Sequence, residues 1–210
     1  MIMYKLSVKI QEIRFDLAKV FYNFYHRTNK APAMAMRNYV ALEGNDWEFL
    51  GHMDLLFDNP AQAIKLNDKY SGYLGIFLND RGDWTVYTKG KFLGILSINV
   101  PSSSKLNHQN IYELTRICFP DYFEMKTNKQ KKYPSKFIRE ATRMFQKEYE
   151  VSKFITYLHE NQNGKYLEYA GFEIDHITKH SKNSKGWATR VGRRKGDTST
   201  KLRFTKQIRL

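Results

Sequence analysis

Apolar residues recur along the chain with two periods, one typical of strands and the other typical of helices. Short apolar runs bounded by turn residues predict β-strands at residues 38–43, 47–57, 73–78, 84–90, 91–100, 110–119, 154–158 and 172–178. Residues 5–27 carry a mixed pattern, in which the first part favours a strand and the second half a helix. The pattern as a whole predicts a mixed α/β (α+β) fold.

A helical pattern is clearest in residues 135–149. The apolar side chains that share one face of this helix are Phe137, Ile138, Ala141, Met144, Phe145 and Tyr149. Residues 163–172 predict a shorter helix, which Gly171 closes at its C-terminus. From residue 91 onward, the predicted order is therefore strand, strand, helix, strand, helix, strand.

The composition indicates a folded chain without a membrane-spanning helix. Of its 210 residues, 41% are hydrophobic and 15% are aromatic, which is too many for a disordered chain. No stretch approaches the roughly twenty apolar residues of a membrane helix, and the N-terminus lacks a cleavage site, so we expect a cytosolic protein. A single cysteine, Cys118, excludes an internal disulfide, and its apolar surroundings favour a buried thiol over a reactive nucleophile.

Positive charge is concentrated at the two ends of the chain. The formal net charge is +14, and residues 179–210 contain eleven Lys and Arg against one acid, Asp197. Arginines bind phosphate, and interleaved aromatic rings can stack on bases, so this segment favours nucleic acid over a merely solvated tail. The residues expected to bind DNA are Lys185, Trp187, Arg190, Arg193, Arg194 and Lys195.

The order of elements from residue 91 onward resembles the core of the GNAT acyltransferases. In that fold a mixed, splayed central sheet is flanked by helices, acetyl-CoA lies in the splay, and its pyrophosphate lies at the N-terminus of the following helix. Free backbone N–H groups and nearby lysines at a helix start attract phosphate, although a solvent-exposed helix start explains the same charges. The residues expected to bind acetyl-CoA are Ile117, Phe119, Asn128, Lys129, Lys132, Ser135, Lys136, Asn161 and Asn163.

Several blocks of sequence resemble, in order and spacing, the Mom family of phage DNA-modification proteins, a divergent GNAT branch. They are FLGILSINVPSSS, IYELTRICFPD, NKQKKYPSKFIREATRMF, NGKYLEYAGF and GWATRVGRRKG, which together span about residues 91–205. The resemblance implies a phage enzyme of the host cell cytoplasm that uses acetyl-CoA. It implies modification of the N6 amine of adenine in DNA, of a carbamoylmethyl type, which protects the DNA from restriction.

The sequence also departs from the family and leaves its catalytic groups open. NKQKKYPSKF replaces the usual glycine-rich phosphate loop, and Leu167 stands where the family has a tyrosine, with tyrosines at Tyr166 and Tyr169 instead. An adenine amine is a poor nucleophile, so the site needs groups that orient it and move protons. The candidates are Glu113 and Asp121 as base, Arg116 as partner or electrophile, and Tyr166 as acid.

Each of these candidates also has a simpler interpretation. Glu113 could be paired with Arg116 on its strand, Asp121 could form a turn, and Asn161 and Asn163 could belong to a cap and turn before the second helix. His52 and Asp54 alternate on one predicted strand, where they could bind a metal, line a base pocket or simply face solvent. The aromatic residues that could stack on a flipped base are Tyr39, Trp47, Tyr112 and Tyr122.

Three functions follow from these patterns. The first is a Mom-like modifier of duplex DNA, the second an ordinary GNAT enzyme acting on a protein, tRNA-linked or small-molecule amine, and the third a nucleic-acid-binding protein without catalysis. We expect a GNAT-like domain at residues 1–178, in which residues 1–90 are part of the core or an extension, and a basic segment at 179–210 that packs on the core or binds DNA. The sequence leaves open the oligomeric state, a homodimer included, and the participation of a metal ion.

Overall fold

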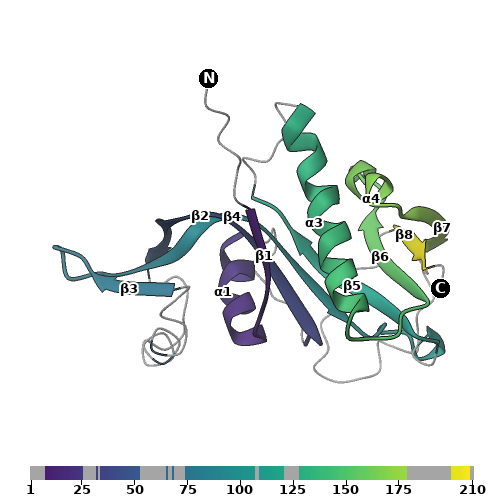
Figure 1. Ribbon diagram of the computed structural model, residues 1–210, viewed down its shortest axis with the longest axis horizontal. Helices are drawn as coiled ribbons and strands as arrows, with labels where there is room; N and C mark the ends of the chain where they lie inside the picture. Colours follow the sequence, from purple (N-terminus) through teal and green to yellow (C-terminus); the bar gives the residue numbers. More distant parts are fainter. Residues whose placement is uncertain are drawn as a thin grey trace.

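A computed structural model shows how these elements are arranged (Figure 1). The residues that it describes are 8–25, 32, 34–52, 65, 68, 74–106, 109–120, 128–178 and 200–208. Its strands are β1 (Val8–Ile13), β2 (Arg37–His52), β3 (Leu74–Leu78), β4 (Trp84–Asn99), β5 (Ile111–Cys118), β6 (Lys153–His159), β7 (Glu173–Thr178) and β8 (Lys201–Gln207). Its helices are α1 (Phe15–Tyr25), α3 (Asn128–Gln146) and α4 (Lys165–Tyr169), with a short 3-10 helix η2 (Ser104–Leu106).

One mixed sheet contains every described strand. Its order is β1-β2-β4-β5-β6-β8-β7, and β3 pairs with β4 beside this path. The pair β5–β6 is parallel, whereas the other described pairs are antiparallel. The helix α3 connects the two parallel strands, as a parallel connection requires. This confirms the mixed α/β fold and the order of elements predicted from residue 91 onward.

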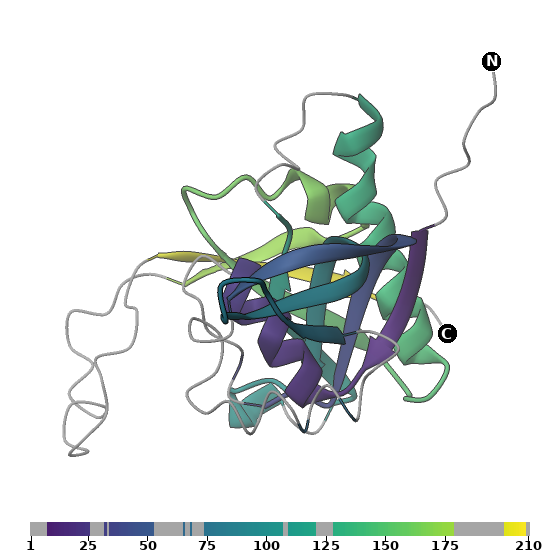
Figure 2. The same ribbon diagram turned by 90° about the vertical axis from the view of Figure 1, so that its left-hand side faces the viewer.

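The sheet has a hydrophobic core on each face, and Figure 2 shows α1 and α3 on opposite sides of it. One core joins Leu17 and Phe21 of α1 to β2 and β4. The larger core joins Phe137 and Phe145 of α3, with α4, to the centre of the sheet and to β8. The strand β4 lies between these two cores, which explains why it reads as a nearly continuous apolar run, FLGILSI. Among the described residues, no helix is long and apolar enough to cross a membrane.

The strand β8 was not predicted, and it lies inside the sheet. It pairs with β6 over its whole length and with β7 on its other edge. Phe204 of β8 is 1% exposed, and its ring lies where a side chain at Gly164 would be, since a Cβ there would be 2.4 Å from the ring. Two further predicted strands, 84–90 and 91–100, are the single strand β4, and residues 53–57 lie outside the described residues.

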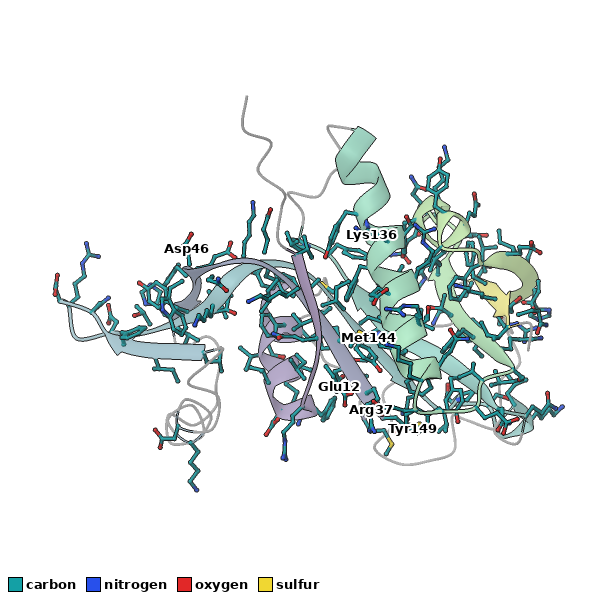
Figure 3. All side chains as sticks on the ribbon, in the orientation of Figure 1. Glu12, Arg37, Asp46, Lys136, Met144 and Tyr149 are labelled. Atoms are coloured by element: carbon teal, nitrogen blue, oxygen red, sulfur yellow. The ribbon has the colours of Figure 1, made fainter. Side chains whose placement is uncertain are left out.

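An ionic cluster ties the N-terminal strands to the end of α3 (Figure 3). The guanidinium of Arg37 lies 3.0 Å from a carboxylate oxygen of Glu12 and 2.8 Å from one of Glu148. Its guanidinium carbon also lies 5.1 Å from the centre of the Tyr149 ring. These contacts join β1, β2 and the turn after α3, so β1 and β2 belong to the same packed body as the later strands.

We expect Phe204→Ala to lower the free energy of unfolding by about 3–5 kcal/mol, because it leaves a cavity beside Gly164 in the larger core. Ile174→Ala on the adjacent strand β7 is the control, because Ile174 is 48% exposed, and it should change stability by less than about 0.5 kcal/mol. Urea denaturation followed by circular dichroism measures both values. Equally small changes in the two variants would show that β8 is not part of the folded core.

Candidate active site

The two parallel strands of the sheet separate soon after they begin to pair. Their register contains three pairs, Ile111 with Lys153, Tyr112 with Phe154 and Glu113 with Ile155. Beyond these pairs, β5 continues to Cys118 and β6 to His159 without pairing to one another. The facing edges of the two strands therefore carry backbone groups that are not used for pairing between them. We call this opening the splay.

A β-bulge in β5 accounts for the splay. The register of β5 with β4 shifts between Ser97, which faces Arg116, and Ile98, which faces Leu114, so Thr115 is the extra residue. A bulge bends its strand and increases the local twist. At the base of the splay, the Thr156 hydroxyl of β6 donates to the Leu114 carbonyl oxygen at 2.9 Å. The Thr156 side chain thus gives a hydrogen bond to a backbone carbonyl that lies just beyond the last residue pair of the parallel ladder.

Buried polar side chains hold the bulge from the α1 side of the sheet. The Ser97 hydroxyl donates to Asn38 Oδ1 at 2.6 Å, which uses its single proton. The Tyr22 hydroxyl of α1 is therefore the donor in its 2.7 Å contact with Ser97, and it also lies 3.3 Å from the Arg116 carbonyl oxygen. Burial raises the pKa of Tyr22, so this hydroxyl stays protonated. The bulge is thus fixed by residues from α1, β2 and β4.

Glu113 lies at the base of the splay, on the face of the sheet opposite α3. The neighbouring Tyr112 points the other way, since its ring lies 4.8 Å from that of Phe145 in α3. The Ser102 N–H and hydroxyl donate to Glu113 Oε2 at 3.3 and 3.4 Å. Burial raises the pKa of Glu113, while the Ser102 hydrogen bonds and the charges of Lys201 and Arg116 oppose this shift. A half-buried carboxylate with a raised pKa is suited to accept a proton.

Arg116 follows the bulge on the same face as Glu113. The two side chains form no ion pair within the described residues, so the simple pairing considered from the sequence is not what holds Glu113. Arg116 Nε is buried and has no hydrogen-bond partner within the part of the chain that the structure describes. Its positive charge acts on Glu113 through space, since it lowers the pKa of that carboxyl.

Polar residues from β6, β7 and β8 extend this face beyond Glu113. Arg203 donates twice to Asp175, with N–O distances of 2.7 and 3.0 Å, and it also hydrogen-bonds Tyr157. Lys201 is close enough to lower the pKa of Glu113. Sequence reasoning missed this group because β8 was not predicted, although alternation along 154–158 could have placed Tyr157 opposite the core. Glu113 therefore faces a charged, open surface.

Tyr166 lies on the other side of the splay, in α4. Its ring lies 5.9 Å from that of Phe119, which follows β5, and Phe119 in turn lies 6.1 Å from Phe137 of α3. Burial raises the pKa of Tyr166 to about 12. Leu167 is fully buried and Tyr169 is 63% exposed, so Tyr166 is the α4 tyrosine that faces the end of β5.

The predicted cofactor residues divide into three groups. Ile117 and Phe119 are half-buried against the larger core near the splay, as expected for residues beside a bound ligand. Helix α3 begins at Asn128, so Ser135 and Lys136 lie about 10 Å along the helix from its start, and their assignment to acetyl-CoA stays a prediction. The side chains of Asn128, Lys129 and Lys132 lie outside the described residues.

The two asparagines before α4, Asn161 and Asn163, lie in the turn that precedes this helix. Asn163 Oδ1 accepts a hydrogen bond from the Lys165 N–H at 3.1 Å, which makes it a turn and helix-start residue. Asn161 is exposed in the same turn. This contact holds the start of α4, and hence Tyr166, in place, and the assignment of Asn161 and Asn163 as cofactor ligands stays a prediction.

Other candidates lie away from the splay or outside the described residues. The His52 ring contacts Phe49 at 5.7 Å, and no group of three metal-binding side chains occurs within the described residues. Tyr39 is fully buried, so it cannot stack on a base, which corrects that candidate. Asp54, Asp121, Tyr122 and the residues from Lys185 to Lys195 lie outside the described residues.

The basic segment at residues 179–199 connects two strands and does not form a C-terminal tail. It leaves β7 after Thr178 and leads into β8 at Lys201, and these two residues are register partners in the sheet. Lys201 is also the residue whose charge acts on Glu113. The residues that precede and follow this segment, Thr178 and Lys201, are therefore held side by side in the sheet, near Glu113.

Comparison with known proteins supports the fold independently of sequence. No family model and no curated protein sequence matches the chain. Among solved structures, a candidate phosphinothricin N-acetyltransferase is similar over 97% of this chain and 100% of its own, with a TM-score of 0.50 and 10% identity. A GNAT-family acetyltransferase from Streptococcus pneumoniae covers 96% and 99%, with a TM-score of 0.48 and 14% identity. A spermidine N-acetyltransferase variant from Vibrio cholerae covers 95% and 94%, at 0.47 and 9%.

The likeness to the candidate phosphinothricin N-acetyltransferase bears on the fold alone. The order of elements from β4 onward, the splay and the helix that follows β5 are those expected of a GNAT core. The chain therefore has the GNAT fold, with β3 as an additional strand on the edge of β4.

Proposed function

We propose that the protein is an acyl-CoA-dependent N-acyltransferase that acts on an amine at the Glu113 face of the sheet. The observation that carries the proposal is the splay, an opening between two strands with a carboxylate on one side and a buried tyrosine on the other. The solved proteins that share the fold are described as N-acetyltransferases, which supports the same reaction class.

The residues around the splay fit a CoA thioester. The edges of β5 and β6 offer backbone groups to the amides of a pantetheine arm, and the half-buried Ile117 and Phe119 supply apolar contact. Helix α3 follows β5, and the free N–H groups of a helix start favour phosphate. When bound, acetyl-CoA would supply an activated acyl group as a thioester. The lysines at 129, 131 and 132 are our proposed phosphate contacts.

Glu113 is the proposed base. Ser102 occupies its Oε2 atom, which leaves Oε1 to receive a proton from the acceptor amine. Because burial raises its pKa, Glu113 is a stronger base than an exposed carboxylate. The charge of Arg116 opposes this shift, since it favours the deprotonated form of the carboxyl.

Tyr166 is the proposed acid. With a pKa of about 12, its hydroxyl remains protonated at physiological pH and can donate to the sulfur of the departing thiolate. A thiol titrates near 8.5, well below this tyrosine, so complete proton transfer is uphill, and the hydroxyl acts by donating a hydrogen bond to the sulfur as the carbon–sulfur bond breaks and charge builds there. Its packing between α4 and Phe119 limits the positions that the hydroxyl can take.

A second candidate keeps the same cofactor and the same site, and it specifies the acceptor as the N6 amine of adenine in DNA. It rests on the resemblance to the Mom family, and a structural feature favours it. The basic connection 179–199 begins and ends beside the open face, where Lys201 already acts on Glu113. A polyphosphate acceptor would find positive charge there, and the net charge of +14 would add to its attraction.

The first prediction of this proposal concerns Glu113. The purified protein should bind acetyl-CoA in calorimetry and release free thiol in the presence of amine acceptors. The rate should fall as pH decreases, with a midpoint above 4.5, because protonated Glu113 cannot accept a proton.

Glu113→Gln should lower kcat/KM by about 10²–10⁴-fold and remove this pH dependence. Glu173→Gln, at an exposed position of β7, is the control. An absence of acetyl-CoA binding would refute the proposal.

The second prediction separates the two tyrosines of α4. Tyr166→Phe should lower kcat by about 10²-fold or more with little change in acetyl-CoA affinity, because it removes one hydroxyl proton and leaves the ring in place. Tyr169→Phe should have no effect, since Tyr169 is 63% exposed on the same helix. Steady-state kinetics and calorimetry measure both. Equal activity of the Tyr166→Phe and wild-type proteins would exclude Tyr166 as the acid.

The third prediction tests DNA as the acceptor. Genomic DNA from bacteria that express the protein should yield, after digestion to nucleosides, a deoxyadenosine of increased mass in mass spectrometry. Expression of Glu113→Ala should yield unmodified deoxyadenosine. Unmodified DNA together with acetyl-CoA binding and acyl transfer would leave the N-acyltransferase and exclude the DNA acceptor.

A further inference from the structure

Arg116 differs from the other partly buried arginines in having no carboxylate partner. Within the described residues, three arginines are half-buried, Arg37, Arg116 and Arg203. Arg37 forms an ion pair with Glu148, and Arg203 forms one with Asp175. No ion pair of Arg116 occurs in the described part of the chain, and its Nε is buried there without a hydrogen-bond partner. A buried charged group without a partner costs free energy, and a bound anion would remove that cost.

The guanidinium of Arg116 lies within electrostatic reach of the candidate base. Arg116 pairs with Ser97 of β4, and the Tyr22 hydroxyl approaches its carbonyl oxygen from α1. Burial raises the pKa of Glu113 and of Tyr22, and the positive charge of Arg116 opposes both shifts. Tyr22 stays protonated, so it does not neutralise this charge.

Glu113 does not neutralise Arg116 by direct contact either, because the two side chains form no ion pair within the described residues. The Ser102 N–H and hydroxyl donate to Glu113 Oε2, which leaves Oε1 for the amine of the acceptor. The face therefore presents a carboxylate and a guanidinium near one another, on the same side of the sheet. A ligand that carries both an amine and an anion is complementary to this pair.

The spacing of Glu113 and Arg116 limits how far apart those two groups of the ligand lie. Because Thr115 is the extra residue of the bulge, their partners on β4, Asn99 and Ser97, are two residues apart, or about 7 Å along the strand. The amine nitrogen and the carboxylate carbon of an α-amino acid are about 2.5 Å apart, and a hydrogen bond of about 2.9 Å at each end extends this span to about 8 Å. In a nucleotide of DNA, by contrast, the base and the sugar separate an adenine amine from the phosphate. The spacing therefore favours a small amino acid.

We propose that Arg116 binds the carboxylate of the acceptor, and that the acceptor is a free α-amino acid. This inference rests on the proposed N-acyltransferase activity and names its substrate class. The amine nitrogen forms a bond to the acyl carbon while the carbon–sulfur bond breaks, and Glu113 takes the proton that the nitrogen loses. The sulfur leaves as a thiolate, which this proton then neutralises. The products are an N-acyl amino acid and CoA in its thiol form.

Arg116 determines specificity through its planar guanidinium, which binds a carboxylate with two N–H donors. An amide in place of the carboxylate offers no anion to this group, and a polyamine brings a second positive charge toward Arg116 and Lys201. Arg203 does not compete for the carboxylate, since it already donates twice to Asp175.

Acceptor pairs that differ only at the carboxylate test the proposal. Thiol release from acetyl-CoA is measured with the full chain and each common amino acid, and with the amide of every amino acid that reacts. For the wild type, kcat/KM should be about 10–100-fold higher for the acid than for its amide, as expected for hydrogen bonds between charged groups. Arg116→Met should remove this preference by raising KM for the acid, and it should leave kcat/KM for the amide within about twofold.

Two further variants separate carboxylate binding from other roles of Arg116. Arg116→Lys keeps the charge but loses the two-pronged geometry, so its preference should be intermediate. Arg143→Met is the matched control, because Arg143 is exposed on α3, and it should behave as the wild type. Loss of the Arg116 charge also lets the pKa of Glu113 rise, so rates are compared at a pH above which they no longer change. Activity on the amide shows that each variant is folded.

An acid that lacks the amine gives a measurement that does not depend on acyl transfer. In calorimetry with protein saturated by CoA, the deaminated analogue of the best amino acid should bind the wild type and Arg143→Met equally. Arg116→Met should bind it about 10-fold more weakly, or not at all.

The outcomes distinguish this inference from the function on which it rests. Acetyl-CoA binding with transfer only to DNA, or only to amines without a carboxylate, would overturn the amino acid acceptor and leave the N-acyltransferase. Acetyl-CoA binding without transfer to any amino acid, or an equal loss on acid and amide in Arg116→Met, would also overturn the inference. Absence of acetyl-CoA binding would overturn the proposed function itself.

Discussion

The whole candidate site depends on the bulge in β5. A regular β5 would pair with β6 along its full length, and the backbone groups of both strands would be used within the sheet. Because Thr115 is extra, pairing stops after Glu113 and Ile155, and the strands diverge. The bulge also determines on which face of the sheet Arg116 lies. Without the extra residue, strand alternation would place Arg116 on the face opposite Glu113, whereas with it the two side chains share a face. The opening and the charged groups beside it are therefore two results of one inserted residue.

The bulge needs support from residues far away in the sequence. Tyr22 and Asn38 meet Ser97 in a buried hydrogen-bonded group, which reaches the Arg116 carbonyl. Leaving any of these polar groups unsatisfied would cost about 1–3 kcal/mol, so they hold α1, β2 and β4 in one arrangement. The N-terminal part of the chain thus acts as the support of the site, a role that its mixed sequence pattern did not suggest.

The periodicity of apolar residues was sufficient to predict most helices and strands, but it was not sufficient to predict how the candidate site is assembled. Amphipathic α3 and the apolar β5 were predictable because their patterns reflect burial on one or two faces. The strand β8 was not, because its sequence KLRFTKQ is basic and its burial depends mainly on Phe204. Glu113 and Tyr166 were candidates through resemblance. Their positions on opposite sides of a splay follow from a register shift, which no residue pattern in a single strand reveals.

The open face has a consequence for the choice of acceptor. An amine that reaches Glu113 must approach over β6, β8 and β7, because α1 covers β2 and β4 and α3 covers the reverse face. On that route Asp175 neutralises Arg203, whereas Arg116 and Lys201 both act on Glu113. Positive charge thus exceeds negative charge around the carboxylate. An acceptor that carries an anionic group beside its amine would be attracted there, while a polycation would be repelled.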